Sequence, residues 1–340
     1  MGLLWSILPM SLRFHEISEA DHRILNPFDE EKLMLLAELC HLREGMRLLD
    51  LACGKGELLA RWAQRHKVIG VGVDLSAVFI EAANARAYEL DIIGQMTFIE
   101  GDAADYPQEH HQFDVVSCLG ATWIGGGLVG TLNLMATALK PSGGLLIVGE
   151  PYWLETPTPE AAAALGYPVG SFATLEGTLD RFEANGLELI DMVLADGDNW
   201  DRYVASQWNT VHQWLRENPN DPDTPAMRLW IAKNRRDYLT YGRQTMGWGV
   251  FILAATHKAS SSAPRVENHS RPVDVEIRDD MLWVGLHDGR VIGNPLAWYP
   301  WLQQATPDSQ TAFDFDAFGI NFSMLGKRID VDALLRGRGE

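Results

Sequence analysis

Short apolar runs alternate with amphipathic segments along the first half of this 340-residue chain. Continuous apolar runs predict buried strands, and segments whose apolar positions recur three or four residues apart predict helices. The expected strands are 47–50, 68–73, 96–99, 113–118 and 145–149, and the expected helices are 58–66, 77–89 and 128–139. Strands that alternate with helices predict an α/β fold with a parallel sheet between two helical layers.

The pattern continues on both sides of this region. Residues 11–41 read as helical, with a break at Asn26-Pro27, and Asp29 is placed to cap a second helix over 30–42. An Ala- and Pro-rich insertion, 156–172, follows the fifth strand. Beyond it we expect a helix over 175–185 closed by Gly186, a strand over 187–195, aromatic-rich helices over 198–217 and 224–241, and a final strand over 248–255. Ser76, like Asp29, is expected to cap the helix that follows it.

A small-polar stretch divides the chain into two expected domains. Residues 1–258 form the first domain, 259–271 the linker, and 272–340 a small α+β domain. In the small domain, 273–277 and 281–286 read as strands, and a helix is expected to begin at Asn294. Its acids lie on turns and it has one histidine, His287, so we expect an interaction or regulatory role.

Charge and cysteine content restrict the partners and the compartment. The net charge of −18 argues against duplex nucleic acid and against an anionic membrane surface, because both are bound through clustered Lys and Arg. Cys40, Cys53 and Cys118 lie far apart, which suits a reducing cytoplasm and offers no metal site. The first nine residues are apolar without the features of a signal peptide, and Met10 is an alternative start. We therefore expect a cytoplasmic protein without a metal.

Candidate chemistry begins at the turn after the first strand. Gly54 and Gly56 lack a Cβ, so a ligand can approach the backbone where the next helix begins. Asp74, at the tip of the second strand, is placed to accept the hydroxyls of a ribose. The NAD fingerprint would need a third glycine at Leu59, whereas an acid at Asp50 can meet the ammonium group of S-adenosylmethionine (SAM). A Rossmann-like crevice for another ligand, or an NAD oxidoreductase, stays as an alternative.

At this point the sequence resembles the class I SAM-dependent methyltransferases, whose first motif looks like Asp50-Leu51-Ala52-Cys53-Gly54-Lys55-Gly56. Ala52 stands where that family usually has a glycine, which is of little consequence if Ala52 keeps φ < 0. The resemblance implies a Rossmann-like fold with a seven-stranded sheet whose last strand is antiparallel. Over about Met10 to His257, the chain is similar to the YjhP-like group of uncharacterised small-molecule methyltransferases. Phrases such as Asn26-Pro27-Phe28 and Gly247-Trp248-Gly249 carry that likeness.

The resemblance also implies which residues bind the cofactor. Asp50 and the glycine turn would hold the methionine part, Asp74 the ribose, and Asp102 with Ala103 the adenine, with Asp105 as the fallback acid. The strand ending at Cys118 would lie beside the transferred methyl group. The expected cofactor-binding residues are Asp50, Ala52, Cys53, Gly54, Gly56, Asp74, Leu75, Asp102, Ala103 and Cys118.

Methyl transfer is an in-line displacement, so the protein mainly aligns donor and acceptor, and a hydroxyl or thiol acceptor also needs a general base. Glu150, at the end of the fifth strand, is the first candidate base, although a capping or ion-pair role fits it equally. His22 and Trp123 are further candidates at the reaction centre. The aromatic set Trp123, Trp153, Trp200, Tyr203 and Trp248 favours a pocket for a small organic acceptor over simple core packing. The alternative is a SAM-binding sensor without turnover, acting through the C-terminal domain.

Overall fold

The computed structural model describes residues 8–106, 111–140, 143–256, 272–286, 290–315, 319–330 and 334. The chain separates into two compact units, Met1–His257 and Lys258–Glu340. The expected linker, 259–271, and His287 lie outside the described residues.

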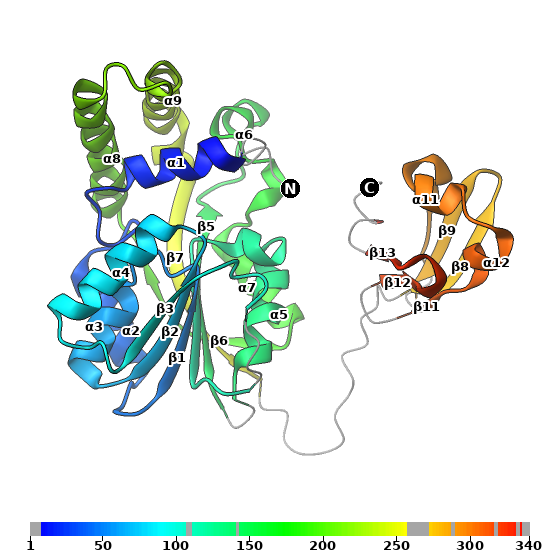
Figure 1. Cartoon of the computed structure of the whole chain (residues 1–340), viewed down its shortest axis with the longest axis horizontal. Coiled ribbons are helices and arrows are strands. Elements are labelled where there is room, and N and C mark those ends of the chain that lie inside the picture. Colours follow the sequence, from blue (N-terminus) through cyan, green and yellow to red (C-terminus); the bar gives the residue numbers. More distant parts are fainter. Residues whose placement is uncertain are drawn as a thin grey trace. The chain divides into compact units, whose positions relative to one another are not determined.

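The first unit is built on a seven-stranded sheet with the order β3-β2-β1-β4-β5-β7-β6 (Figure 1). The strands are β1 (Arg47–Leu51), β2 (Ile69–Asp74), β3 (Met96–Glu100), β4 (Val115–Leu119), β5 (Leu145–Trp153), β6 (Leu187–Leu194) and β7 (Met246–Ala255). Neighbours from β3 to β5 pair in parallel, whereas β7 is antiparallel to both β5 and β6. The expected α/β class and the antiparallel closing strand are confirmed.

Helices cover both faces of this sheet (Figure 1). One face carries α2 (Glu30–Leu39), α3 (Glu57–His66) and α4 (Ala77–Glu89), and the other carries α5 (Leu128–Ala138) and α7 (Leu175–Ala184). The two layers bury separate apolar clusters because the side chains of each strand alternate between the two faces. Asp29 and Ser76 accept hydrogen bonds from Lys32 N and Phe79 N, so both expected helix caps are present.

Strand β5 extends four residues beyond its expected end at Gly149. It continues to Trp153 because β7 begins at Met246 and pairs with β5 from Leu146 to Trp153. Residues Tyr238–Gly242 form a π-helical turn after α9 (Thr224–Asp237), where an uninterrupted helix was expected.

A group of helices lies over the end of the sheet at which the parallel strands terminate (Figure 1). Helix α1 (Leu8–Ser18) packs with α8 (Gly197–Glu217) and α9 through a small core formed by Phe14, Val211, Leu215, Met227 and Ile231. Glu16 of α1 accepts a 2.6 Å hydrogen bond from Ser76 Oγ, at the start of α4. The short elements α6 (Pro159–Leu165), η2 (Val169–Ser171) and α10 (Arg243–Thr245) complete this unit. The amino-terminal segment is therefore joined directly to the strand ends.

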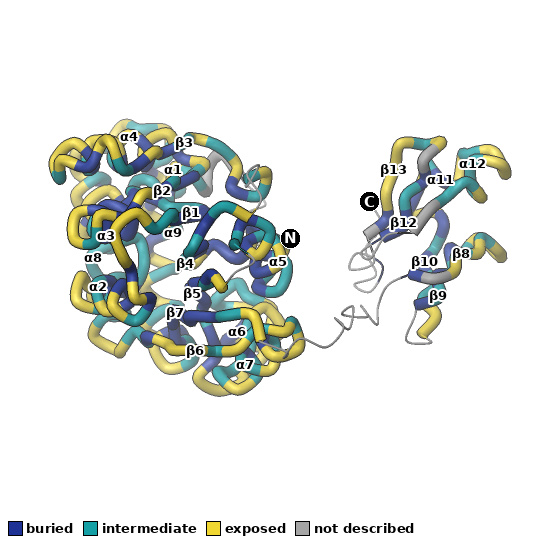
Figure 2. Tube along the Cα trace, turned by 90° about the horizontal axis from the view of Figure 1, so that it is seen from below, coloured by how far each residue is buried: buried dark blue, intermediate teal, exposed yellow. Residues whose placement is uncertain are grey.

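The second unit contains two small antiparallel sheets. The first has the order β10-β9-β8 and the second β11-β12-β13. The strands are β8 (Pro272–Arg278), β9 (Met281–Leu286), β10 (Val291–Pro295), β11 (Asp314–Phe315), β12 (Gly319–Phe322) and β13 (Lys327–Asp330), with short helices η4 (Leu296–Trp298), α11 (Pro300–Gln303), α12 (Pro307–Thr311) and η5 (Ser323–Leu325). Figure 2 shows buried residues on the strands of this unit.

The expectation that a helix begins at Asn294 is wrong. Asn294 and Pro295 are the last residues of β10 and pair with Leu282 and Met281. The Asn294 side chain is buried and donates a 3.0 Å hydrogen bond to the hydroxyl of Tyr299. The cross-strand partners supplied by β9 outweigh the local turn signal of Asn-Pro. In neither unit do the described residues include a helix long and apolar enough to cross a bilayer.

Candidate active site

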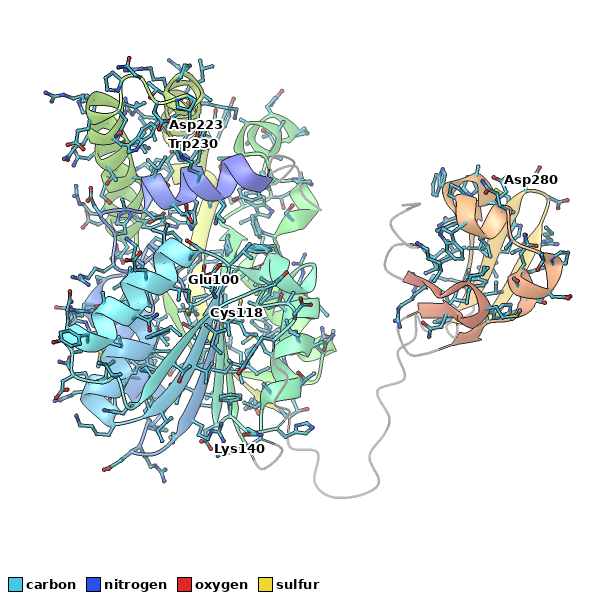
Figure 3. All side chains as sticks on the ribbon, in the orientation of Figure 1. Glu100, Cys118, Lys140, Asp223, Trp230 and Asp280 are labelled. Carbon is cyan, nitrogen blue, oxygen red and sulfur yellow. The ribbon has the colours of Figure 1, made fainter. Side chains whose placement is uncertain are left out.

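Two carboxylates stand at the ends of neighbouring strands. Asp50 pairs in register with Gly72 of β2 and with Ser117 of β4, and Asp74 is the last residue of β2. Because β1 and β2 run in parallel, both side chains belong to the same edge of the sheet. Figure 3 labels Cys118, one residue beyond Ser117, near the end of the sheet that lies below α1.

The turn after β1 is held to the end of β2 by backbone hydrogen bonds. Cys53 N donates to Val73 O at 2.9 Å, and Gly54 N donates to Asp74 Oδ2 at 2.8 Å. The other oxygen of Asp74 accepts from Ser76 N at 2.9 Å. Burial is the first cause that raises the pKa of Asp74, and these two N–H groups oppose it. Asp74, at the end of β2, thus holds the turn after β1 in place through its side chain.

Ala52 adopts the left-handed conformation with φ +57°, as do Gly54 at +54° and Gly56 at +68°. The condition under which alanine would matter little here, a negative φ at Ala52, is not met. Ala52 lies directly after β1, at the start of the turn that leads into α3, and Gly54 and Gly56 of the same turn share its left-handed conformation. The substitution of alanine for the usual glycine therefore carries backbone strain.

Neighbouring side chains also require the two glycines of the turn. A Cβ at Gly54 would lie 2.7 Å from Leu25 Cδ1, and one at Gly56 would lie 2.5 Å from Phe98 Cε1. Leu25, from the segment after α1, therefore packs directly on the turn. From the sequence, we expected glycine at these two positions because a ligand must approach the backbone closely. The structure adds two further reasons for glycine, a positive φ and close packing of neighbouring side chains.

Asp50 is almost completely buried, with 3% of its surface exposed. Burial raises its pKa to about 7; a 2.6 Å hydrogen bond from Ser117 Oγ to Oδ1 opposes this rise, and the nearby charge of Asp74 adds to it. Among the described residues, Oδ2 of Asp50 has no hydrogen-bond partner. A buried carboxylate with one unused oxygen fits a cationic ligand, which would complete its hydrogen bonding and favour its ionised form.

The strand ends next to Asp74 combine apolar and polar surface. Leu75, directly after β2, has 46% of its surface exposed, and Ala103, after β3, is buried. Asp102 is exposed and its Oδ1 accepts a 2.8 Å hydrogen bond from Ala104 N, while the fallback acid Asp105 is also exposed. The ends of β2 and β3 thus present both an exposed apolar side chain and exposed carboxylates.

Glu150 lies in β5 opposite Gly249 of β7 and is 2% exposed. Burial raises its pKa to about 7, against a 2.6 Å hydrogen bond that Thr122 Oγ1 donates to Oε2. Thr122 begins η1 (Thr122–Gly125), in which Trp123 is half exposed. Cys118 is fully buried, and burial, followed by the charges of Asp50 and Glu150, raises the pKa of its thiol. Cys118 lies on β4, the strand between those that carry Asp50 and Glu150.

His22 belongs to a polar cluster that links the end of α1 to α8. Its Nδ1 lies 2.6 Å from Glu19 Oε2, and its Nε2 contacts Ser206 Oγ. Glu19 is fully buried and accepts a 2.6 Å hydrogen bond from the Tyr203 hydroxyl. The sequence indicated His22 and Tyr203 separately but not their connection through Glu19 and Ser206, because these positions lie more than 180 residues apart.

Lys55 was missed by the sequence analysis. From the centre of the glycine turn, its Nζ donates to the backbone oxygens of Glu19, Ala20 and His22 at 2.7, 2.8 and 2.7 Å. One ammonium thereby uses its three donors on the segment that carries His22. The only sequence signal was its position between Gly54 and Gly56.

The aromatic residues expected to wall a pocket divide into two groups. Trp153 and Trp248 are both 2% exposed; Trp153 Nε1 donates to Val169 O, and Trp248 packs edge-on against Phe28. These two are core residues. Tyr203 stacks on His22 with ring centroids 5.0 Å apart, and half-buried Trp200 contacts Tyr203. The second group, together with exposed Trp123, stays as the candidate pocket wall.

Comparison with known proteins gives matches to both units of the chain. Residues 48–143 match a family model described as a methyltransferase domain, and residues 272–340 match a family of unknown function, DUF2442. The chain is 44% identical over 245 residues to the uncharacterized protein YjhP of Escherichia coli, covering 72% of this chain and 98% of that protein.

Two solved structures show the same architecture. A SAM-dependent methyltransferase from Thiobacillus denitrificans, in complex with S-adenosyl-L-homocysteine, is 42% identical with a TM-score of 0.68. Its counterpart from Geobacter sulfurreducens, also in complex with S-adenosyl-L-homocysteine, is 41% identical with a TM-score of 0.69. Each comparison covers 72% of this chain and 98% of the solved chain.

Proposed function

This chain belongs to the class I SAM-dependent methyltransferases, and we propose that it transfers the methyl group of SAM to a small organic molecule. The family supplies the reaction and the cofactor. The acceptor, the residues that hold each part of SAM and the cytoplasmic location are parts of the proposal. Three free cysteines, two of them buried, support a reducing compartment.

The buried Asp50 is the observation that carries the proposal. One of its oxygens is not used by the described residues, and Asp50 lies just before the turn that leads into α3, so a cationic amino group bound at this strand end would find a carboxylate to pair with. In this arrangement Asp50 and the segment of Ala52, Cys53, Gly54 and Gly56 hold the methionine part. Asp74 holds the ribose beside Leu75, and Asp102 and Ala103 contact the adenine. SAM supplies an electrophilic methyl group on a sulfonium.

The reaction centre is proposed above the end of β4, between Cys118 and the candidates Glu150, Trp123 and His22. Cys118 and Glu150 are buried at these strand ends, and a low local dielectric strengthens electrostatic contacts with a sulfonium bound beside them. Two candidate proton acceptors come from different elements. One is the Glu150 carboxylate of β5, and the other is His22, paired with the Glu19 carboxylate, in the segment after α1.

A screen of metabolite extracts with methyl-labelled SAM tests the proposal. Label in a small product supports an enzyme with a small acceptor. Label in nucleic acid or protein contradicts the small acceptor. Tight SAM binding with no transfer to any acceptor supports the sensor alternative, and competition between SAM and NAD in the same calorimeter tests the choice of cofactor.

A further inference from the structure

A buried carboxylate fixes the orientation of one imidazole in this protein. The Glu19 side chain has no exposed surface and accepts from His22 Nδ1, the Tyr203 hydroxyl and Gln207 Nε2. Burial would raise the pKa of Glu19, but the His22 hydrogen bond, the nearby His15 and His22 and the Tyr203 hydroxyl together lower it. The Glu19 carboxylate accepts from Nδ1–H of His22, which fixes the ring orientation and leaves Nε2 as the ring nitrogen that can take up a proton.

The partner of His22 Nε2 is a hydroxyl that can reverse its direction. Ser206 Oγ contacts Nε2 and also lies 3.1 Å from the backbone oxygen of Tyr203. When the ring is neutral, Ser206 donates its proton to Nε2. When the ring is protonated, Nε2–H donates to Ser206 Oγ, and the hydroxyl proton turns to Tyr203 O. Both protonation states of His22 are thus hydrogen-bonded, as a group that accepts and returns a proton requires.

The same segment is joined to the cofactor turn. Lys55 holds the backbone of Glu19, Ala20 and His22, and Leu25 packs on Gly54. A Cβ at Gly120, just after β4, would lie 2.6 Å from Asn26 Oδ1, so residues 22–26 cross the ends of both β1 and β4. The side chain of His22 keeps 14% of its surface exposed. The segment that carries the imidazole is accordingly held at the strand ends where methyl transfer is proposed.

We propose that the methyl acceptor is a hydroxyl compound and that His22 Nε2, directly or through Ser206 Oγ, removes the hydroxyl proton. This inference rests on the proposed function and identifies its substrate class. As the acceptor oxygen forms its bond to the methyl carbon, the carbon–sulfur bond of SAM breaks and the electron pair stays on sulfur. The sulfonium becomes a neutral thioether, and the acceptor proton is held by His22, whose positive charge Glu19 balances.

The chemistry of the possible acceptors explains why a positioned base indicates that the methyl group goes to an oxygen atom. A neutral amine attacks without prior loss of a proton, and thiols ionise near pH 8.5, whereas phenolic hydroxyls ionise near pH 10. A hydroxyl therefore gains the most from a positioned base. Glu150 is less suited to this task, since its side chain is nearly inaccessible and already accepts the hydrogen bond from Thr122.

The experiment combines product identification with variants of the full-length protein. The product from ¹³C-methyl-labelled SAM and cell extract is examined by NMR, in which methoxy, N-methyl, S-methyl and C-methyl carbons have separate shifts. His22→Ala and Glu19→Gln are compared with His212→Ala, which alters an exposed histidine of α8 outside the cluster. Calorimetry with S-adenosylhomocysteine reports whether each variant keeps the folded cofactor site.

We expect a methoxy product. We also expect His22→Ala to lower kcat by ~10²–10⁴-fold with cofactor affinity unchanged, and added imidazole to restore part of the rate. His212→Ala keeps the wild-type rate. An N-, S- or C-methyl product overturns the inference while leaving the methyltransferase proposal standing, and so does a His22→Ala variant with wild-type kcat or without imidazole rescue. Absence of any labelled product contradicts the proposed function itself, and this inference with it.

Discussion

The backbone N–H of Gly54 donates a 2.8 Å hydrogen bond to Oδ2 of Asp74, twenty residues further along the chain. This contact joins the turn after β1 to the end of β2, and the second oxygen of Asp74 holds Ser76 at the start of α4. One carboxylate thereby sets the relative position of two helix starts. The proposed ribose contact and the shape of the glycine turn depend on the same side chain.

Replacing Asp74 with alanine should weaken cofactor binding by at least about tenfold, because hydrogen bonds to a charged group contribute ~1.5–3 kcal/mol each. The variant also frees Gly54 N and Ser76 N, so the turn loses its two fixed donors. Calorimetric titration with SAM measures the change. Asp180→Ala, at an exposed position of α7, is the matched control. Unchanged affinity in Asp74→Ala would remove Asp74 from the cofactor site.

Cofactor binding should release a proton below neutral pH. Burial raises the pKa of Asp50 to about 7, so the carboxyl is largely protonated at pH 6. An ammonium partner favours the carboxylate, and the affinity for SAM should therefore rise about tenfold per pH unit up to pH 7 and then level off. Calorimetry at pH 6 in buffers of different ionisation enthalpy counts the released proton. Asp50→Asn should bind SAM weakly and release none, and proton release by this variant would assign the titration to another group.

The same carboxyl contributes to the pH dependence of stability. Its pKa in the folded protein lies above the ordinary value of 3.8, so between about pH 4 and 7 the folded state keeps a proton that the unfolded state has lost. The free energy of unfolding contributed by Asp50 therefore falls as pH rises through this window. Denaturant titrations of wild type and Asp50→Asn at pH 5 and pH 7.5 should show a smaller pH dependence in the variant.

Ala52→Gly should stabilise the protein by about 1 kcal/mol, since a left-handed conformation costs a residue with a Cβ ~1–2 kcal/mol and glycine little. The measurement is the free energy of unfolding from urea titration. Ala85→Gly, at an exposed position inside α4, should have the opposite sign and destabilise by about 1 kcal/mol. Equal effects of the two substitutions would argue that Ala52 is not strained.

Lys55→Met should loosen the segment that carries His22 while leaving the sheet intact. It removes three hydrogen bonds to backbone oxygens, and methionine is of similar length but offers no donor. We expect faster amide exchange over residues 17–26 and a lower kcat, with exchange in β4 and β5 unchanged. Lys55→Arg keeps the positive charge but not the compact ammonium group. Its amide exchange and kcat should lie between those of the wild type and Lys55→Met. Unaltered exchange at residues 17–26 in Lys55→Met would contradict the role given to Lys55.

Local signals predicted much of the first unit. The order of apolar runs and amphipathic segments indicated the strands and helices, and Asp29 and Ser76 were expected as caps because their side chains act on N–H groups three residues away. The placement of Asp50 and Asp74 at one edge followed from the parallel order of two successive strands. Where long-range partners competed with local preference, as at Asn294 in β10 and at the extended end of β5, the expectations failed.

By itself, the sequence determined the fold class and the strand-end acids, since both depend on short-range periodicity, and the resemblance of its first motif to the class I methyltransferases implied the cofactor. Only the tertiary structure decided the left-handed state of Ala52, the burial that shifts the pKa of Asp50, and the cluster that joins Glu19 and His22 to Ser206. These features arise from groups that are distant along the chain and meet through packing. Their geometry and desolvation exist only once α1, α8 and the strand ends have come together.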